Sequence, residues 1–151
     1  MMFAQKQWQA GATTTEGCER SSQRLPMPRL KDKVAPVTGG SRGIGAAIAR
    51  RLAHEGAAAS ITYSVSRQSA DAVADGIKAD GAKSLAIQAD NADVHAVKAA
   101  IAETVKTFGR LDVLVNNAGI LRFGAISNYS LEELDRMIAV AMRLWTRCPT
   151  I

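Results

Sequence analysis

The sequence predicts an α/β fold with a doubly wound parallel sheet that stops after about four strands. Short apolar runs alternate with amphipathic stretches of about 10–15 residues, which is typical of strands joined by crossover helices. A glycine follows several of the amphipathic stretches, as expected where a helix ends. The chain has 151 residues, of which 47% are apolar and 22% are charged, and this composition suits one globular domain.

The first predicted unit is a strand, a tight turn and a helix within residues 33–53. An apolar run leads into a glycine-rich turn, and the turn leads into a stretch of strong helix formers. Ile44, Ile48 and Leu52 recur there at helical spacing, so we expect them on one face of the helix.

Three further strands and three further helices are predicted along the chain. Apolar and β-branched runs place strands at residues 57–64, 84–89 and 111–115. Helices are predicted over about 67–79 and 94–108, the second of them with Asp93 or Asn91 as its N-cap. A last helix begins near Ser130 and has apolar residues along one face: Leu131, Leu134, Ile138 and Met142. Such alternation implies parallel strands with right-handed crossovers.

The glycine-rich turn at residues 38–45 indicates a phosphate site. A helix start offers unpaired N–H groups and the positive end of the helix dipole, both of which favour an anion. We expect Gly39 to let the chain leave the strand sharply and Gly43 to remove a side chain where a pyrophosphate approaches. Gly45 is expected to let the helix pack closely on the sheet. The alternative is a flexible loop that is merely rich in glycine.

Charge and composition argue against nucleic-acid and membrane partners. The net charge is +5, but residues 1–33 and 136–151 each contribute +3 and the middle of the chain is at −1. No apolar run approaches the roughly 20 residues that cross a bilayer, and the N-terminus lacks a secretory pattern. We therefore expect a cytoplasmic protein. Cys18 and Cys148 are too few for a metal site or a disulfide framework.

The two ends of the chain differ from the middle. Residues 1–29 are predicted to be a disordered N-terminal extension, 30–143 a partial nucleotide-binding domain and 144–151 an unrelated tail. Two alternatives for the N-terminal stretch are a weak targeting helix and an upstream extension of a frame that starts near Met27.

Two motifs at the carboxyl ends of predicted strands give the chain a family resemblance. Thr-Gly-Gly-Ser-Arg-Gly-Ile-Gly at residues 38–45 and Asn-Asn-Ala-Gly at 116–119 resemble the short-chain dehydrogenase/reductase family, and Asp90 fits as well. The 3-oxoacyl-carrier-protein reductases and related NADP-dependent enzymes are the most similar subgroup. The resemblance covers about residues 30–142 and implies a Rossmann-like domain.

The resemblance implies a dinucleotide site along the carboxyl edge of the sheet. The glycine turn would contact the pyrophosphate and the adenosine ribose, Asp90 and Asn91 the adenine, and residues 117–119 the surroundings of the nicotinamide ribose. Alternatively, Asp90 caps a helix and the asparagines only tie loops together. With the residues that charge suggests for a 2′-phosphate, the candidate cofactor-binding residues are Gly39, Gly40, Ser41, Arg42, Gly43, Ile44, Gly45, Ser64, Arg67, Asp90, Asn91, Asn117, Ala118 and Gly119.

The end of the second predicted strand favours NADP over NAD. NAD sites place an acid there, on the ribose 2′-hydroxyl, but residues 63–67 contain none. Arg42 and Arg67 would attract a 2′-phosphate, and Ser64 could donate a hydrogen bond to it. The alternative is that both arginines are ordinary surface charges.

The chain departs from the family in its catalytic residues. The family uses a Ser, a Tyr and a Lys four residues after that Tyr, because a phenol with a pKa near 10 needs a cation beside it to exchange protons. Here Arg67 follows Tyr63 and Glu133 follows Tyr129 at that spacing. Two further departures are Ala141, where the family has Asn, and Pro36, whose missing N–H removes a bond from a central strand.

Two functions follow from these observations. The first is an NADP-dependent short-chain oxidoreductase, which reduces a small carbonyl substrate or oxidises a secondary alcohol, with its catalytic half missing here. The second is a non-catalytic nucleotide-binding fragment or a decayed gene product. The resemblance leaves a homo-oligomer open. Without further strands we expect an unpaired sheet edge, an exposed apolar face on the last helix and marginal stability.

Overall fold

Three parallel strands and four helices make up the part of the chain that the computed structural model describes, residues 29–125 and 129–142. The predictions for the N-terminal extension and for the tail at 144–151 lie outside these residues, apart from Arg29. The elements follow one another as predicted over most of the chain. Their order is β1 (Val34–Val37), α1 (Gly43–His54), β2 (Ala58–Tyr63), α2 (Arg67–Ala79), β3 (Ser84–Gln88), α3 (Val94–Phe108) and α4 (Leu131–Met142).

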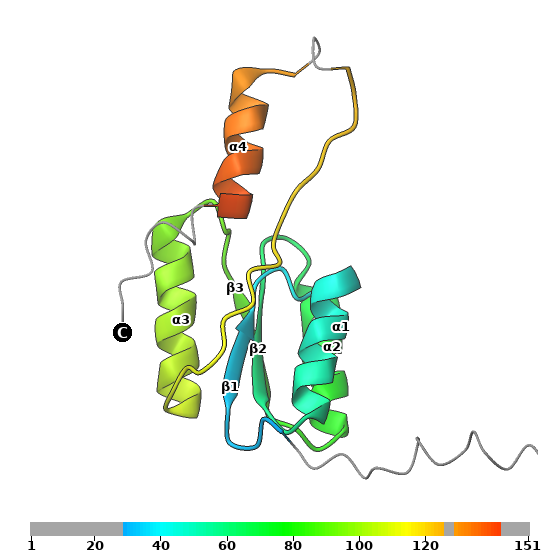
Figure 1. Cartoon of the computed structure of the whole chain (residues 1–151), viewed down its shortest axis with the longest axis vertical. Helices are drawn as coiled ribbons and strands as arrows, with labels where there is room; N and C mark the ends of the chain where they lie inside the picture. Colours follow the sequence, from blue (N-terminus) through cyan, green and yellow to red (C-terminus); the bar gives the residue numbers. More distant parts are fainter. Residues whose placement is uncertain (1–28, 126–128, 143–151) are drawn as a thin grey trace, which may run out of the picture.

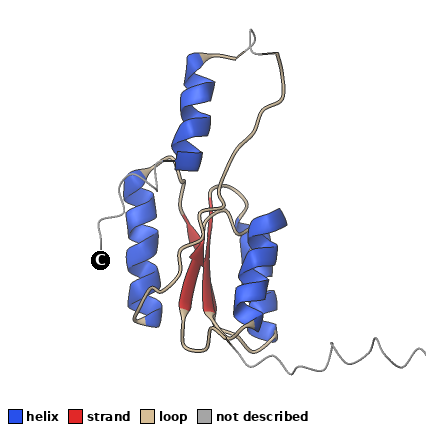
Figure 2. Ribbon diagram, viewed as in Figure 1, coloured by secondary structure: helices blue, strands red, loops and turns tan. Residues whose placement is uncertain are grey.

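The sheet has the order β1-β2-β3, and both strand pairs are parallel. Val34 is paired with Ala58 at one end of the β1–β2 ladder, and Ile61 lies between Val37 and Ala86. Helices α1 and α2 cover one face of the sheet and α3 covers the other, as Figures 1 and 2 show. The predicted α/β class with a parallel sheet is thus confirmed.

The core lies between the sheet and helices α1 and α2. Ile61 and Ile77 are the largest fully buried side chains, and small alanines of α1 pack around them. The predicted apolar face of α1 is correct in part, since Ile48 and Leu52 pack against the core. Ile44, by contrast, is 75% exposed. It lies in the first turn of α1, where the glycine turn and the helix overlap.

The predicted strand at 111–115 is wrong as a full strand, because only Val115 forms a bridge, with Val37. The segment nevertheless runs beside β1. The Val113 and Val115 N–H groups donate to the Val34 and Pro36 carbonyls at 3.1 and 2.9 Å. In a parallel ladder the N–H of residue 36 would return a bond to the Val113 carbonyl, and proline has no such group. The ladder between β1 and this segment is therefore interrupted, and one bridge remains, between Val37 and Val115.

Asp112 fastens this segment to the start of β1. Its carboxylate accepts from the Val34 N–H at 3.0 Å and from Lys33 Nζ at 3.1 Å. Arg110 Nε donates to the same group at 2.7 Å, and Arg110 Nη2 contacts the second oxygen. The Arg110 hydrogen bonds, with smaller contributions from Val34 and Lys33, hold the pKa of Asp112 well below its usual range. Side-chain bonds thus reinforce a pairing that the backbone makes only in part.

Helix α4 begins as predicted, with a reciprocal cap. The Glu133 N–H donates to Ser130 Oγ at 3.2 Å, and the Ser130 N–H donates to Glu133 Oε2 at 3.3 Å, which is a capping box. Only Ala139 and Val140 of α4 are buried. The predicted apolar face is exposed, as expected: Leu131 by 80%, Leu134 by 45%, Ile138 by 49% and Met142 by 57%. Among the described helices, none combines the length and the apolar character of a membrane span.

Replacing Pro36 with Val or Ala should stabilise the chain. Either residue supplies the N–H that can reach the Val113 carbonyl, and one added hydrogen bond contributes about 1 kcal/mol. Urea unfolding should show the gain, and the new amide of residue 36 should be protected from hydrogen exchange. Two variants that both unfold at lower urea, with an unprotected amide, would contradict the explanation given for the interrupted ladder.

The Asp112 carboxylate should make stability depend on acid. Because its pKa is lowered on folding, its contribution is fully present above about pH 4, the ordinary pKa of an aspartate, and is lost as the pH falls below that. We expect Asp112→Asn to be less stable than the wild type at pH 7, with the difference shrinking toward pH 2.5. Urea titrations of both proteins across this range measure it. A difference that stays constant with pH would show that the charge does not matter.

Candidate functional site

The glycine turn lies at the carboxyl end of β1 and opens α1. Gly39 and Gly43 have φ angles of +65° and +56°, a region that favours glycine. A Cβ on Gly39 would lie 2.9 Å from the Ala118 Cα, so the chain turns sharply there against a neighbouring segment. A Cβ on Gly43 would meet nothing within 4 Å. The backbone at Gly43 therefore faces open space, as the pyrophosphate hypothesis requires.

The other two glycines of the turn allow close approach within the protein. A Cβ on Gly40 would come within 2.6 Å of the Ile61 side chain on β2. A Cβ on Gly45 would come within 2.6 Å of the Gly39 carbonyl oxygen, and it would also collide with the Asn117 amide. The close approach at Gly45 is thus to the turn and to Asn117, whereas the sequence suggested the sheet.

Thr38 joins the glycine turn to the segment that follows Val115. Its hydroxyl accepts from the backbone N–H groups of Asn117 and Ala118, both at 3.0 Å. The Asn117 side chain donates in return to the Thr38 carbonyl at 2.9 Å and to the Gly39 carbonyl at 3.2 Å. Asn117 therefore ties loops together, which was the structural alternative for it. It is half-buried and lies beside the turn, so this role does not remove it from the site.

Thr62 holds the turn from the other side. Its hydroxyl accepts from the Gly39 N–H at 3.3 Å, and its carbonyl accepts from the Gly40 N–H at 3.0 Å. Sequence reasoning did not single out Thr38 or Thr62 as positioning residues. A buried threonine at the end of a strand, next to a glycine turn, was the available signal.

The first turn of α1 has no competing anion. Arg42 is the N-cap residue, with extended backbone, and its side chain makes no capping bond. The first turn has no acidic residue. The N–H groups of this helix start, together with the positive end of the dipole, are thus available to a ligand. Ser41 lies half-buried before the helix start, and Arg42, Gly43 and Ile44 are exposed at it.

Asp90 and Asn91 follow β3, so they share the carboxyl edge of the sheet with the glycine turn. Asp90 Oδ1 accepts from the Ala92 N–H at 2.9 Å, which forms a local turn. The N-cap of α3 is Asp93, whose carboxylate accepts from the His95 N–H at 2.8 Å. The prediction of Asp93 as the cap is confirmed, and Asn91 and Asp90 do not cap the helix. Asn91 is buried, whereas Asp90 is half-buried.

Ser64 and Arg67 follow β2 at the same edge, and both are exposed. The Ser64 carbonyl accepts a hydrogen bond from Gln88 Nε2 at 3.2 Å, and the Ser64 hydroxyl takes no part in that bond. Arg67 Nε lies 3.4 Å from the Asp71 carboxylate, in an exposed pair one helical turn apart. Gly119 faces open space beyond Ala118. The predicted residues therefore lie along one edge, and hydrogen bonds join the glycine turn to Asn117 and Ala118.

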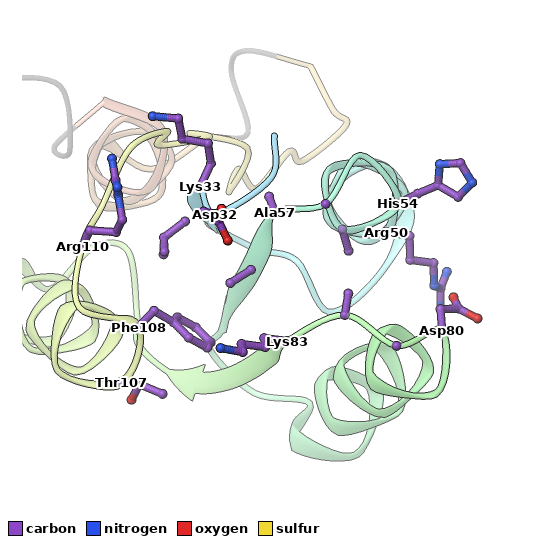
Figure 3. Close-up of a pocket in the computed structure, with 16 residues that line it drawn as sticks. Asp32, Lys33, Arg50, His54, Ala57, Asp80, Lys83, Thr107, Phe108 and Arg110 are labelled. Carbon is purple, nitrogen blue, oxygen red and sulfur yellow. The ribbon is translucent and has the colours of Figure 1, made fainter. Parts of the chain in front are cut away.

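A separate cavity of about 650 Å³ lies at the opposite, amino-terminal end of the strands (Figure 3). None of the predicted cofactor-binding residues lines it. Its charged residues have mixed signs: Asp32, Lys33, Arg50, Asp80, Lys83 and Arg110. Because parallel α/β sheets bind ligands beyond the carboxyl ends of their strands, we place the candidate site at the glycine turn and not in this cavity.

Known proteins resemble the chain over this same region. A family model described as short chain dehydrogenase matches residues 33–145. The chain is 51% identical over 106 residues to 3-oxoacyl-[acyl-carrier-protein] reductase FabG of Staphylococcus aureus, which covers 70% of this chain and 43% of that protein. It is 48% identical over 115 residues to versicolorin reductase 1 of Aspergillus parasiticus, over 76% of this chain and 44% of that protein.

Solved structures agree with the sequence matches. A short chain dehydrogenase from Burkholderia cenocepacia in complex with NADP has a TM-score of 0.74 and 52% identity, over 76% of this chain and 47% of that one. A blue fluorescent protein from a metagenomic library in complex with NADPH has a TM-score of 0.73 and 44% identity, over the same shares. The chain spans less than half the length of these relatives. It belongs to the short-chain dehydrogenase family.

Proposed function

We propose that this chain binds NADP(H) along the carboxyl edge of its sheet and is the cofactor-binding unit of a short-chain oxidoreductase. The observation that supports this most directly is the uncapped start of α1 behind the open backbone at Gly43. Pyrophosphate needs both backbone N–H groups and an approach free of side chains. Asn117 and Ala118 brace the turn in this shape from the next segment.

The remaining cofactor-binding assignments belong to this proposal. Gly39, Gly40, Ser41 and Ile44 would surround the pyrophosphate and the adenosine ribose, with Gly45 shaping the turn. Asp90 and Asn91 would meet the adenine, and Ala118 and Gly119 would lie near the nicotinamide ribose. Their positions at neighbouring strand ends support this arrangement.

NADP is the proposed cofactor because positive charge is available where the 2′-phosphate would lie. Residues 63–67 contain no acid to accept a ribose 2′-hydroxyl. The Arg42 side chain is exposed and does not cap α1, and Arg67 is 81% exposed with one loose partner. Solved relatives bound to NADP or NADPH support the same choice.

The proposed reaction of the whole enzyme is hydride transfer between NADP(H) and a carbonyl or secondary alcohol. The cofactor supplies the hydride chemistry, and protein groups orient the reactants. A second candidate, nucleotide binding without catalysis, describes what these 151 residues would do by themselves, because they contain no Tyr-x-x-x-Lys. NADPH oxidation with a generic ketone, measured beside NADPH binding, separates the two. The carbonyl or alcohol class of substrate, the homo-oligomer that the resemblance leaves open and the cytoplasmic location stay predictions.

A matched pair of substitutions at Gly43 tests the pyrophosphate contact. Asn and Asp both tolerate a positive φ and have nearly the same shape, but Asp adds a negative charge where the phosphates would lie. We expect Gly43→Asp to bind NADPH at least about tenfold more weakly than Gly43→Asn, measured by nucleotide fluorescence.

A less stable helix cannot explain weaker NADPH binding by Gly43→Asp, because an acidic residue in the first turn stabilises a helix. Gly76→Ala, in the last turn of α2, controls for glycine replacement elsewhere. Equal NADPH affinities for the two Gly43 variants would refute the proposed site.

The arginine at the helix start should discriminate between the two cofactors. We expect Arg42→Gln to weaken NADPH binding about tenfold and NADH binding less than twofold, because only NADPH offers a 2′-phosphate. Arg50→Gln removes an exposed arginine from the same helix at the opposite end of the strands, and it should change neither affinity. Parallel losses for NADPH and NADH in Arg42→Gln would argue against the phosphate contact.

A further inference from the structure

An ion pair joins α4 to the edge of the sheet at the proposed adenine position. Arg136 Nη2 on α4 lies 3.4 Å from Asp90 Oδ2, beyond the end of β3. The other Asp90 oxygen accepts from the Ala92 N–H. A helix far along the chain thus places a guanidinium beside the carboxylate that follows β3.

Stability alone gives little reason for this pair. The side chains of Arg136 and Asp90 are 63% and 40% exposed. An exposed pair at this distance contributes at most about 1 kcal/mol, and salt screens it. Both side chains can form further hydrogen bonds while they are paired, because a guanidinium has five N–H donors and a carboxylate has several acceptor positions.

We infer that Arg136 is a base-positioning residue that, with Asp90, makes this site specific for adenine. The inference rests on the proposed NADP(H) site. Adenine presents a 6-amino donor beside the N7 acceptor on one edge. A carboxylate next to a guanidinium presents the complementary order of acceptor and donor. Asp90 accepts from the 6-amino group, and Arg136 donates to N7 while it keeps the carboxylate oriented.

The chemistry assigns different consequences to the two residues. Hypoxanthine keeps N7 but replaces the 6-amino donor with a carbonyl acceptor, which would face the Asp90 carboxylate. Loss of the Arg136 donor should therefore weaken both purine cofactors alike. Loss of the Asp90 charge should instead reduce the preference for adenine over hypoxanthine.

The test compares three reduced cofactors by fluorescence titration: NADPH, its hypoxanthine analogue, and nicotinamide mononucleotide, which has no purine. We expect the wild type to prefer NADPH over the hypoxanthine analogue by about tenfold. Arg136→Gln should weaken both dinucleotides about five- to tenfold and leave the mononucleotide within twofold. Asp90→Asn should lower the preference for adenine to threefold or less.

Arg122→Gln is the matched control. Arg122 pairs with Glu133 of α4, so this substitution also removes a charged contact of the helix, but away from the end of β3. If Arg136 only held α4 in place, the two arginine variants would lose the same affinity, and the inference would be overturned. It would also be overturned if Arg136→Gln bound NADPH as tightly as the wild type. A wild type that binds no NADPH would instead refute the proposed function itself.

Discussion

The shape of the candidate site depends on the bonds between Thr38 and the segment at 117–118. The sheet alone cannot fix that segment, because Pro36 interrupts its ladder with β1 and leaves one bridge at Val115. The Thr38 hydroxyl accepts hydrogen bonds from two backbone N–H groups of the segment. The Asn117 side chain donates two hydrogen bonds to carbonyl oxygens of the turn. This reciprocal set fixes the turn in the form in which Gly43 is open and α1 is uncapped.

Much of the fold follows from local signals in the sequence. Helices α2 and α3 begin and end within a residue or two of their predicted bounds, and α4 begins one residue after Ser130, because glycines, an aspartate cap and a capping box mark these positions. The predicted strand at 111–115 failed for a non-local reason. Its residues have strand character, but regular pairing needed a donor from residue 36, far away in the chain. The sequence shows the proline, but it does not show that the missing N–H would have donated to the Val113 carbonyl.

The candidate site shows the same division between local and long-range information. Glycine spacing identified the turn. The positive φ angle at Gly39 agrees with the sharp turn predicted there, and the open space at Gly43 agrees with the prediction that a side chain is absent there for a reason. The function of Gly45 was misjudged, because its close neighbours belong to the turn itself and to a segment more than seventy residues later in the chain. Thr38 and Thr62 were missed as positioning residues for a similar reason. A threonine in a strand is ordinary until its partners are known.

More than half of the buried apolar residues in the described part of the chain are alanines. Alanines let α1 and α2 lie close to the strands, yet each has only a methyl group to bury. Truncating substitutions have little to remove at such positions, so cavities are a minor hazard for this protein. Enlargement is the greater one, because an added branch at Ala49 or Ala59, neither of which has any exposed surface, would push a helix away from the sheet. Substitutions in this core are therefore limited mainly by the largest side-chain volume that fits between the helices and the sheet.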